Sequence, residues 1–412
     1  MKHVKLLFGI LVIFSTLLST WVLPSLVKRM TDEARNYPFV YYSSILKEIC
    51  LFDFVHNSET FHDIKGNTYP QTQYDSLLPL LNFRQLMMNG SLPDSLEGQA
   101  LEPKTLHTKQ VVFRFYPAKV NAPQHQMGTL LEAMPKRLAL TLPGDYFRMD
   151  NSITFIDATT NTVNHAKSER FTKELEKKGF AFPVKHYWGN PTTRKPYEEG
   201  YFCLDNNGQL FQLKMVNGRP FVKDTGMGKI MDITWFAMQE VSDKRYYGYL
   251  FGSKGEMGII ESTDEGGYKY IPMDIPHIDI QKDDITIMGN MLYWTVRVKN
   301  ANGMDVYALK TSTLECVSSH HIDKMNTLWD KLSEWLFITS VMPTSDHNAY
   351  ISLYFTPLSG KALLLNAILA LFVFLGWKKS LPLRRRGCVA LYLLPTGLIG
   401  LLTLVFLPPL EE

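Results

Sequence analysis

The chain has 412 residues, of which 45% are hydrophobic and 20% are charged, and its mean hydropathy is -0.09. These averages fit a globular protein with a large core. With 26 glycines, 22 prolines and 4 cysteines, the composition excludes collagen-like, wholly disordered and disulfide-scaffold classes. The most apolar stretches lie near the two ends, which indicates a membrane-anchored chain.

The charges are also unevenly distributed. Eight of the 43 Lys and Arg residues, but only two of the 40 Asp and Glu residues, lie outside residues 28–360. This middle region therefore carries a charge of -3, although the whole chain carries +3. Nucleic-acid binding needs a basic face that neutralises phosphates. The sequence therefore predicts that the protein does not bind nucleic acid. The apolar ends predict the lipid bilayer as a partner.

The first apolar stretch covers residues 6–27 and contains no charged residue. As a helix it would be about 33 Å long, enough for a hydrocarbon core of about 30 Å. A cleaved signal peptide is the alternative, but the stretch is long for one and lacks an Ala-x-Ala type of cleavage site. We therefore expect a retained transmembrane anchor in residues 1–27.

Two further apolar stretches, 362–377 and 389–407, predict a C-terminal transmembrane hairpin in residues 361–412. The first stretch is short, but Lys361 and Lys378 can extend it by snorkelling. A buried helical hairpin of a soluble protein is the alternative. Together with the first anchor, the sequence predicts three transmembrane helices.

The loop 378–387 holds five positive charges and no acid, so the positive-inside rule places it in the cytoplasm. With three spans, residues 28–360 then form an extracytoplasmic domain of a protein of the cytoplasmic (inner) membrane.

The middle region reads as a series of short strands. Stretches that begin at residues 201, 245 and 284 each alternate apolar runs with Gly or Asn turns such as Asn217-Gly218. A period of about 40 residues with three or four strands is typical of propeller blades. We expect a mainly β, propeller-like domain, with another all-β meander or sandwich as the alternative.

Further strands are expected at 111–116, 138–142, 153–156 and 350–355, and helices at 77–88, 168–178 and 324–337. The last helix is amphipathic, and its Trp residues could pack on the β domain or lie on the membrane surface.

The sequence contains no His-Glu-x-x-His, Gly-x-Ser-x-Gly, Gly-x-Gly-x-x-Gly or complete P-loop motif. We therefore expect no enzymatic activity, no catalytic residues and no cofactor. The pairs His56/His62 and His320/His321 lack chelating spacing, so no metal site is expected. Cys50, Cys203 and Cys316 could form at most one bridge, and buried free thiols are the other possibility.

The segment 179–201 combines prolines, glycines and aromatic residues, which is typical of an ordered loop. It is a candidate ligand or partner site, with a crossover between blades as the structural alternative. The candidate residues are Lys185, His186, Tyr187, Trp188, Asn190, Arg194, Lys195, Glu198 and Glu199.

In the third apolar stretch, Gly397 and Gly400 lack side chains, so another helix can approach them closely. We expect them to take part in helix packing, either with a membrane partner or between the chain's own spans.

Several segments carry a family resemblance, namely Phe83-Arg-Gln-Leu-Met-Met-Asn-Gly90, Leu92-Pro-Asp94-Ser95, Asp157 to Asn161, Lys167-Ser168, Gly179-Phe-Ala-Phe-Pro183, Gly189-Asn-Pro191 and Glu199-Gly-Tyr-Phe202. They resemble an uncharacterised bacterial family of membrane-anchored domains of unknown function that accompany ABC-type transporter components. The resemblance implies an accessory subunit of a transport complex whose partner is an ABC-type transporter. An extracytoplasmic module that binds or senses a sugar, peptide, haem or metal is the alternative function.

Overall fold

The computed structural model describes residues 2–31, 37–55, 58–123, 127–137, 139–342, 345, 347–355, 359–376 and 382–407. The chain divides into two compact units, one of residues 37–323 and one formed by residues 1–36 together with 324–412. Each unit is described separately below.

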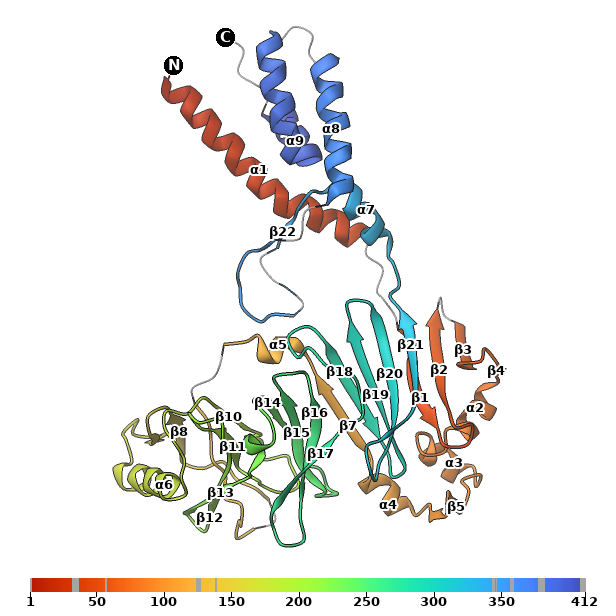
Figure 1. Ribbon diagram of the computed structural model, residues 1–412, viewed down its shortest axis with the longest axis vertical. Coiled ribbons are helices and arrows are strands. Elements are labelled where there is room, and N and C mark those ends of the chain that lie inside the picture. The colour runs from red at the N-terminus through yellow and green to blue at the C-terminus, as the bar shows by residue number, and fades with distance from the viewer. Residues whose placement is uncertain are drawn as a thin grey trace. The chain divides into compact units, whose positions relative to one another are not determined.

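Four antiparallel sheets build the unit of residues 37–323 (Figure 1). The first sheet has β1 (Phe39–Ser43), β2 (Glu48–Val55), β3 (Ser58–Asp63) and β4 (Thr68–Tyr69). The second has β10 (His186–Gly189), β11 (Tyr201–Leu204), β12 (Leu210–Val216) and β13 (Arg219–Asp224). The third has β14 (Ile233–Met238), β15 (Tyr246–Gly252), β16 (Met257–Ser262) and β17 (Tyr268–Pro272). The fourth has β18 (Asp284–Gly289), β19 (Tyr293–Asn300), β20 (Gly303–Lys310), β21 (Cys316–Asp323) and, beside β18, β7 (Val111–Phe115).

The predicted turn chemistry explains the meanders. Asn217 and Gly218 join β12 to β13 with φ values of 51° and 72°, and Val216 pairs with Arg219 directly across the turn. Asn and Gly tolerate positive φ, and such a turn matches the twist of a hairpin. The mainly β prediction is confirmed, and the stretches expected from 201, 245 and 284 begin with β11, β15 and β18.

Short helices and hairpins lie between β4 and β10 in the sequence. They are the helices α2 (Gln71–Leu77), α3 (Phe83–Met88), α4 (Pro103–Thr108), α5 (Pro117–Val120) and α6 (His165–Lys177), and the hairpins β5 (Ser95–Leu96) with β6 (Gln99–Ala100) and β8 (Asp145–Met149) with β9 (Ile153–Asp157). Of the helix expected at 77–88, residue 77 is the end of α2 and residues 83–88 form α3, with a turn between them. The strand expected at 138–142 is absent from residues 139–142, and residue 138 lies outside the described residues.

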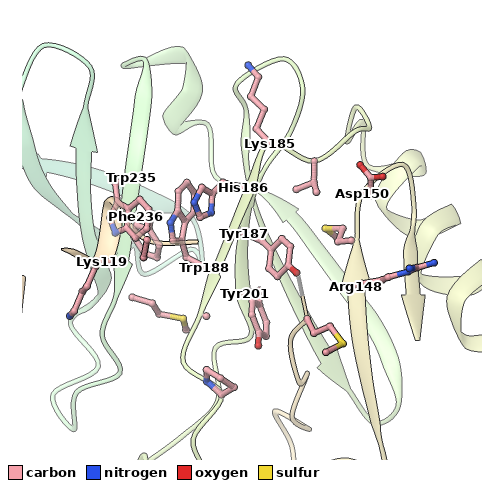
Figure 2. A pocket seen from close by; sticks show the side chains of 18 of the residues that line it. Lys119, Arg148, Asp150, Lys185, His186, Tyr187, Trp188, Tyr201, Trp235 and Phe236 are labelled. Carbon is pink, nitrogen blue, oxygen red and sulfur yellow. The ribbon is translucent and has the colours of Figure 1, made fainter. Parts of the chain in front are cut away.

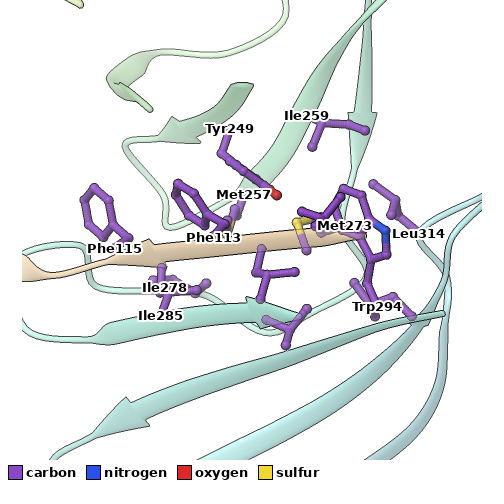
Figure 3. Packing of buried hydrophobic residues seen from close by; sticks show 14 of the residues in the cluster. Phe113, Phe115, Tyr249, Met257, Ile259, Met273, Ile278, Ile285, Trp294 and Leu314 are labelled. Carbon is purple, nitrogen blue, oxygen red and sulfur yellow. The ribbon is translucent and has the colours of Figure 1, made fainter. Parts of the chain in front are cut away.

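The sheets pack face to face in series, each through its own apolar cluster. The hairpin β8–β9 and α6 pack on the second sheet through Phe147 and Phe171, and the second sheet packs on the third through Phe202 and Phe236. The third packs on the fourth around Phe113, whose ring centroid lies 3.9 Å from that of Tyr249 (Figure 3). The fourth packs on the first through another cluster.

The structure therefore matches the expected propeller only in its repeating unit, the four-stranded meander. Four-stranded meanders follow one another as blades do, but within the described residues the series has two ends, β1–β4 and β8–β9, and no closed ring forms. The reason lies in residues 70–144. This segment forms short helices and the strand β7, which joins the fourth sheet and does not start a blade that would close the ring.

The alternating pattern of β7 explains its position. Val111, Phe113 and Phe115 are buried, whereas Val112 and Arg114 between them are exposed. Successive residues of a strand point to opposite faces, so one face of β7 enters the core. Burying each Phe contributes about 1.5 to 3 kcal/mol.

The second unit contains α1 (Lys2–Thr31), α7 (Leu328–Leu336), β22 (Val341–Met342), β23 (Tyr354–Phe355), α8 (Gly360–Leu375) and α9 (Leu383–Phe406). Two helices, Leu6–Thr31 within α1 and Leu383–Phe406, are long and apolar enough to cross a membrane, and α8 is a shorter apolar helix. They indicate membrane association. The strand expected at 350–355 covers only its last two residues, and the helix expected from 324 begins at Leu328.

Candidate functional site

A cleft of about 1050 Å³ opens in the unit of residues 37–323. Its walls come from β7, β10 and β14, each of which is the edge strand of its sheet, and from the turn between β8 and β9 (Figure 2). In a blade series these edges lie on the inner side, where a closed propeller would have its central channel. The missing part of the ring leaves this inner surface open.

Aromatic rings form the inner part of the cleft. The imidazole of His186 stacks on Trp188 at a centroid distance of 4.3 Å and an interplanar angle of 9°. The same imidazole meets Trp235 edge to face at 5.0 Å and 75°. Such offset and perpendicular arrangements are the favoured ones for rings with a quadrupole. Tyr187 and Tyr201 continue the aromatic surface towards the β8–β9 hairpin (Figure 2).

The ring nitrogens of this cluster have few partners. Both nitrogens of His186 and Nε1 of Trp188 are buried without a hydrogen-bond partner in the described part of the chain. Burial lowers the pKa of His186, so its imidazole is neutral at pH 7. An N–H facing an aromatic ring gains a weak interaction, and the perpendicular contact of His186 with Trp235 allows one. Stacking and burial, not a charge, hold this residue.

Cations outnumber anions on the cleft wall. Its charged lining residues are Lys119, Arg148 and Lys185 against Asp150. Lys119 is exposed, and it donates to the Arg114 carbonyl at 3.1 Å. Arg148, Asp150 and Lys185 are exposed, and Figure 2 shows Lys185 and Arg148 pointing away from the aromatic rings. The cleft thus has an apolar centre and a mainly positive rim.

The structure separates the predicted loop residues into two groups. Lys185, His186, Tyr187 and Trp188 lie on the cleft wall, and His186 to Gly189 form a short strand where the sequence indicated only a loop. Asn190, Lys195, Glu198 and Glu199 instead belong to a polar cluster behind it, described next. Arg194 is exposed and belongs to neither.

The polar cluster centres on a buried lysine between two buried carboxylates. Lys195 Nζ lies 2.8 Å from Glu240 Oε2 and 2.7 Å from Glu198 Oε2, and the three side chains are 3%, 0% and 2% exposed. Lys195 Nζ also donates to Glu240 Oε1 at 2.8 Å. The Glu198 contact has the distance of an ion pair, but its direction does not fit a hydrogen bond. We call Lys195, Glu198 and Glu240 the charged triad.

Backbone and amide groups complete the triad's environment. Glu240 accepts from Asn190 Nδ2 at 3.0 Å and from the Glu199 amide at 2.7 Å. Glu198 accepts from the Gly200 amide at 2.6 Å. Since Glu240 follows β14 and the other groups lie between β10 and β11, the triad ties the second sheet to the third. It holds the cleft wall, and it offers no exposed group to a ligand.

The triad has two carboxyl groups for one ammonium group, and its burial shifts the pKa of both carboxyl groups. Burial raises the pKa of Glu198 to about 7 and also raises the pKa of Glu240, while Lys195 opposes both shifts. A carboxyl that is kept from water takes up a proton more readily. Glu198 therefore gains and loses its proton near neutral pH, well above the range of an exposed carboxyl.

Sequence reasoning missed Trp235, Arg148 and Glu240. Trp235 and Arg148 come from other sheets than the predicted loop, and Glu240 is 45 residues from Lys195. No local spacing links them. The one local signal is in β8, where exposed Arg148 lies between buried Phe147 and Met149, an alternation typical of a strand with one buried face.

Other candidate groups lie away from the cleft. Within the described ranges, no group of three or more His, Cys, Asp or Glu side chains is placed to hold a metal ion. His321 Nδ1 lies 2.6 Å from Asp305 Oδ1, and His56 lies outside the described residues. All four cysteines are free thiols, and burial raises the pKa of Cys50 to about 12, so this thiol is not reactive.

The two glycines of α9 that were expected to take part in helix packing, Gly397 and Gly400, are both buried. Gly397 has φ of 52° and interrupts the helix, and the side chain of Asn366 from α8 lies where its Cβ would be. Gly400 lies against Thr396 and Tyr392 of its own helix. Gly397 therefore takes part in packing within the chain, where it lets α8 approach α9 closely. Contact of these glycines with a membrane partner stays a prediction.

Comparison with known proteins identifies a family but no activity. Residues 39–309 match the family DUF4857, a domain of unknown function, and no curated protein matches the chain. The match covers more than half of the 412 residues, so the chain belongs to the DUF4857 family. The uncharacterised family expected from the sequence is confirmed to this extent.

Proposed function

We propose that this protein is a membrane-anchored extracytoplasmic binding domain whose cleft takes an anionic ligand with flat apolar faces. The observation that carries the proposal is the cleft between β7, β10 and β14, with its stacked aromatic rings and its positive rim. Binding sites are typically concave and apolar, with a few polar groups that set orientation. This favours the ligand-binding function that the sequence offered as its alternative.

The chemistry of the lining selects among the ligands expected. Aromatic faces bind the C–H faces of sugars and the side chains of peptides, and Lys and Arg at the rim attract acidic groups. Haem and metal ions need ligating side chains, whereas the nitrogens of His186 are covered by Trp188 and Trp235. Acidic oligosaccharides and acidic peptides fit this lining best.

The binding role does not require catalysis, and we propose that the protein is not an enzyme. Of the carboxyl groups near the cleft, Glu198 and Glu240 have raised pKa values, and both are buried and paired with Lys195. Perturbed groups that are used in catalysis need access to a substrate.

The binding proposal is tested with arrays of immobilised uronic-acid oligosaccharides and acidic peptides, probed with the detergent-solubilised full chain. Arg148→Glu and Lys185→Glu should weaken binding to the array ligand found, and Lys229→Glu is the matched control, exposed and outside the cleft lining. Trp188→Ala should cost about 2 kcal/mol, or about 30-fold in Kd, as the removal of a central aromatic contact does.

Failure of both charge reversals to weaken binding, or equal weakening by Lys229→Glu, would contradict the assignment of this cleft. Because Arg148 and Lys185 are exposed, their substitution leaves the core intact. Folding therefore does not confound this part of the test.

For the membrane part, we propose three spanning helices, α1, α8 and α9, with the DUF4857 domain outside the cytoplasmic membrane. Two of the helices are long enough alone, and the shorter α8 packs along α9, where Asn366 Nδ2 donates to the Leu394 carbonyl at 3.1 Å. In a bilayer such a contact satisfies groups that lipid cannot.

An accessory role beside an ABC-type transporter is a separate proposal, supported by the resemblance described above. Its test is affinity purification of the full chain in mild detergent, followed by identification of membrane proteins that are bound. A preparation that contains this chain alone would contradict it without affecting the ligand proposal.

A further inference from the structure

The helix α7 has apolar side chains that the described residues of its unit leave exposed. None of its nine residues is buried, and Leu328 and Trp335 are 52% and 47% exposed. The sequence nevertheless makes it a stable helix, because Thr327 accepts from the Asp330 amide and Asp330 accepts from the Thr327 amide. Such a reciprocal cap fixes the start of a helix before any ligand binds.

The helix α7 is fixed at the N-terminal end of α8. The Ser359 amide donates to the Ile338 carbonyl at 2.9 Å, and Lys361 forms an ion pair with Glu334. Packing contacts also join α7 to α1. The helix thus lies where α8 begins and not beside its middle (Figure 1).

A second apolar surface lies in the same unit, around the hairpin β22–β23. Val341 pairs with Phe355, and Ser25 Oγ of α1 donates to Met342 Sδ of β22 at 3.8 Å. Ile351, Leu353 and Phe355 are 88%, 67% and 69% exposed. Single exposed apolar residues are ordinary, but a group of this kind marks an interaction surface.

We infer that α7 and residues 351–355 form one lipid-binding surface that lies in the interface of the bilayer crossed by α1, α8 and α9. The inference rests on the membrane anchoring proposed above. Both apolar groups adjoin the ends of apolar helices, so the bilayer that covers those helices is continuous with them. Trp and Leu on one face and charged residues on the other are typical of helices that lie in this interface.

Depth-dependent quenching tests the inference on the full chain in bilayers of phosphatidylethanolamine and phosphatidylglycerol. The background carries Cys316→Ser and Cys388→Ser, because Cys50 and Cys203 are buried. An environment-sensitive fluorophore is attached after Trp335→Cys or Leu353→Cys. Phe14→Cys in α1 and Leu371→Cys in α8 report the spans, and Met88→Cys, 83% exposed in the other unit, is the aqueous control.

At positions 335 and 353 we expect a blue-shifted emission that nitroxides near the headgroups quench largely and nitroxides deep in the acyl chains quench little. Position 88 should show no quenching. If nitroxides quench the fluorophore at 14 and 371 but fail to quench it at 335, at 353 or at both, the proposed lipid-binding surface would be contradicted. The membrane anchor would then still be supported. Blue-shifted emission at 335 or 353 that lipid nitroxides do not quench would assign the surface to a protein and also overturn the inference. Absence of quenching at 14 and 371 would instead contradict the membrane anchor.

Discussion

Lys195 lies in a loop, but we expect its charge to contribute strongly to the stability of the folded protein. It is 3% exposed and lies within 2.8 Å of oxygens from both Glu198 and Glu240. Removing one partner of a buried ion pair leaves the other uncompensated, which costs about 3 to 5 kcal/mol. We expect Lys195→Met to lower the urea concentration at which half of the full chain is unfolded. Tryptophan fluorescence measures this midpoint.

The matched control is Lys173→Met. Lys173 pairs with Glu169 on the surface of α6, and the two side chains are 70% and 65% exposed. Exposed pairs contribute little to stability, so the midpoint should not change. Equal midpoints for the two variants would show that the charged triad does not hold the sheets together.

The protonation of Glu198 should make stability fall as the pH rises. Its pKa is about 7 in the folded chain against an ordinary value of 4.5. Between these values the folded state binds more protons than the unfolded state, so stability is full below about pH 4.5 and is lost as the pH rises through about 7. The loss should be on the order of 2 kcal/mol.

Glu198→Gln checks this dependence, since the amide resembles the protonated carboxyl at every pH. The variant should match the parent near pH 5 and should unfold at a higher urea concentration than the parent near pH 8. The stability of the variant will still depend somewhat on pH, because burial also raises the pKa of Glu240. A parent curve with the same pH dependence as the variant would contradict a protonated Glu198.

The predictable part of the site is local in sequence. Prolines and aromatic residues mark 179–201 as an ordered segment, and Lys185 to Trp188 within it do line the cleft. The roles of Asn190, Lys195, Glu198 and Glu199 were not predictable, because their partner Glu240 lies beyond four more strands. Buried charges leave no mark in a sequence until their partner is known.

At the scale of the helix, the break in α9 depends on one glycine. Gly397 has φ of 52°, a conformation that costs other residues energy, and Asn366 occupies the space of its missing Cβ. We expect Gly397→Ala to loosen α8 from α9 and to lower the temperature at which the detergent-solubilised chain loses its helical circular dichroism.

Gly387→Ala is the control for this prediction. It lies in the same helix, and a Cβ there meets nothing within 4 Å, so replacing glycine by alanine in a helix should be neutral or stabilising. A thermal midpoint of Gly397→Ala that equals that of Gly387→Ala would show that the Asn366 contact is dispensable.

The strands that could be predicted are those bounded by turn residues. The strands β11, β15 and β18 begin within one residue of the expected positions 201, 245 and 284, because Asn-Gly and related turns interrupt apolar runs. β10 could not be predicted, since it has four residues in a proline-rich segment. β3 is polar and β4 has two residues, so neither has a strong apolar pattern.

At the scale of the molecule, the order of the sheets depends on contacts between distant residues. The Tyr42 amide of β1 donates to Thr295 Oγ1 of β19 at 3.0 Å, across 253 positions of sequence. A period of about 40 residues predicts repeated sheets, but not where a ring stays open. Here β7 joins the fourth sheet at the position beside β18, and the inner edges remain accessible as a cleft.

The orientation that we propose for the protein in the membrane rests on positive charges that helix stability does not explain. α9 begins at Leu383, several residues before the span expected at 389, so Arg384, Arg385 and Arg386 lie in its first turns. Positive charges at a helix N-terminus oppose the helix dipole, whereas the positive-inside rule accounts for them. Lys378 and Lys379 of the same loop lie outside the described residues.

We therefore expect residue 382 to face the cytoplasm and residue 150 to face the outside. In a background with Cys316→Ser and Cys388→Ser, a membrane-impermeant maleimide should label Asp150→Cys in intact cells, since Asp150 is exposed. It should label Pro382→Cys only after the membrane is permeabilised, because translocating a loop with five Lys and Arg residues is unfavourable. Labelling of Pro382→Cys in intact cells would reverse the orientation and place the cleft on the cytoplasmic side.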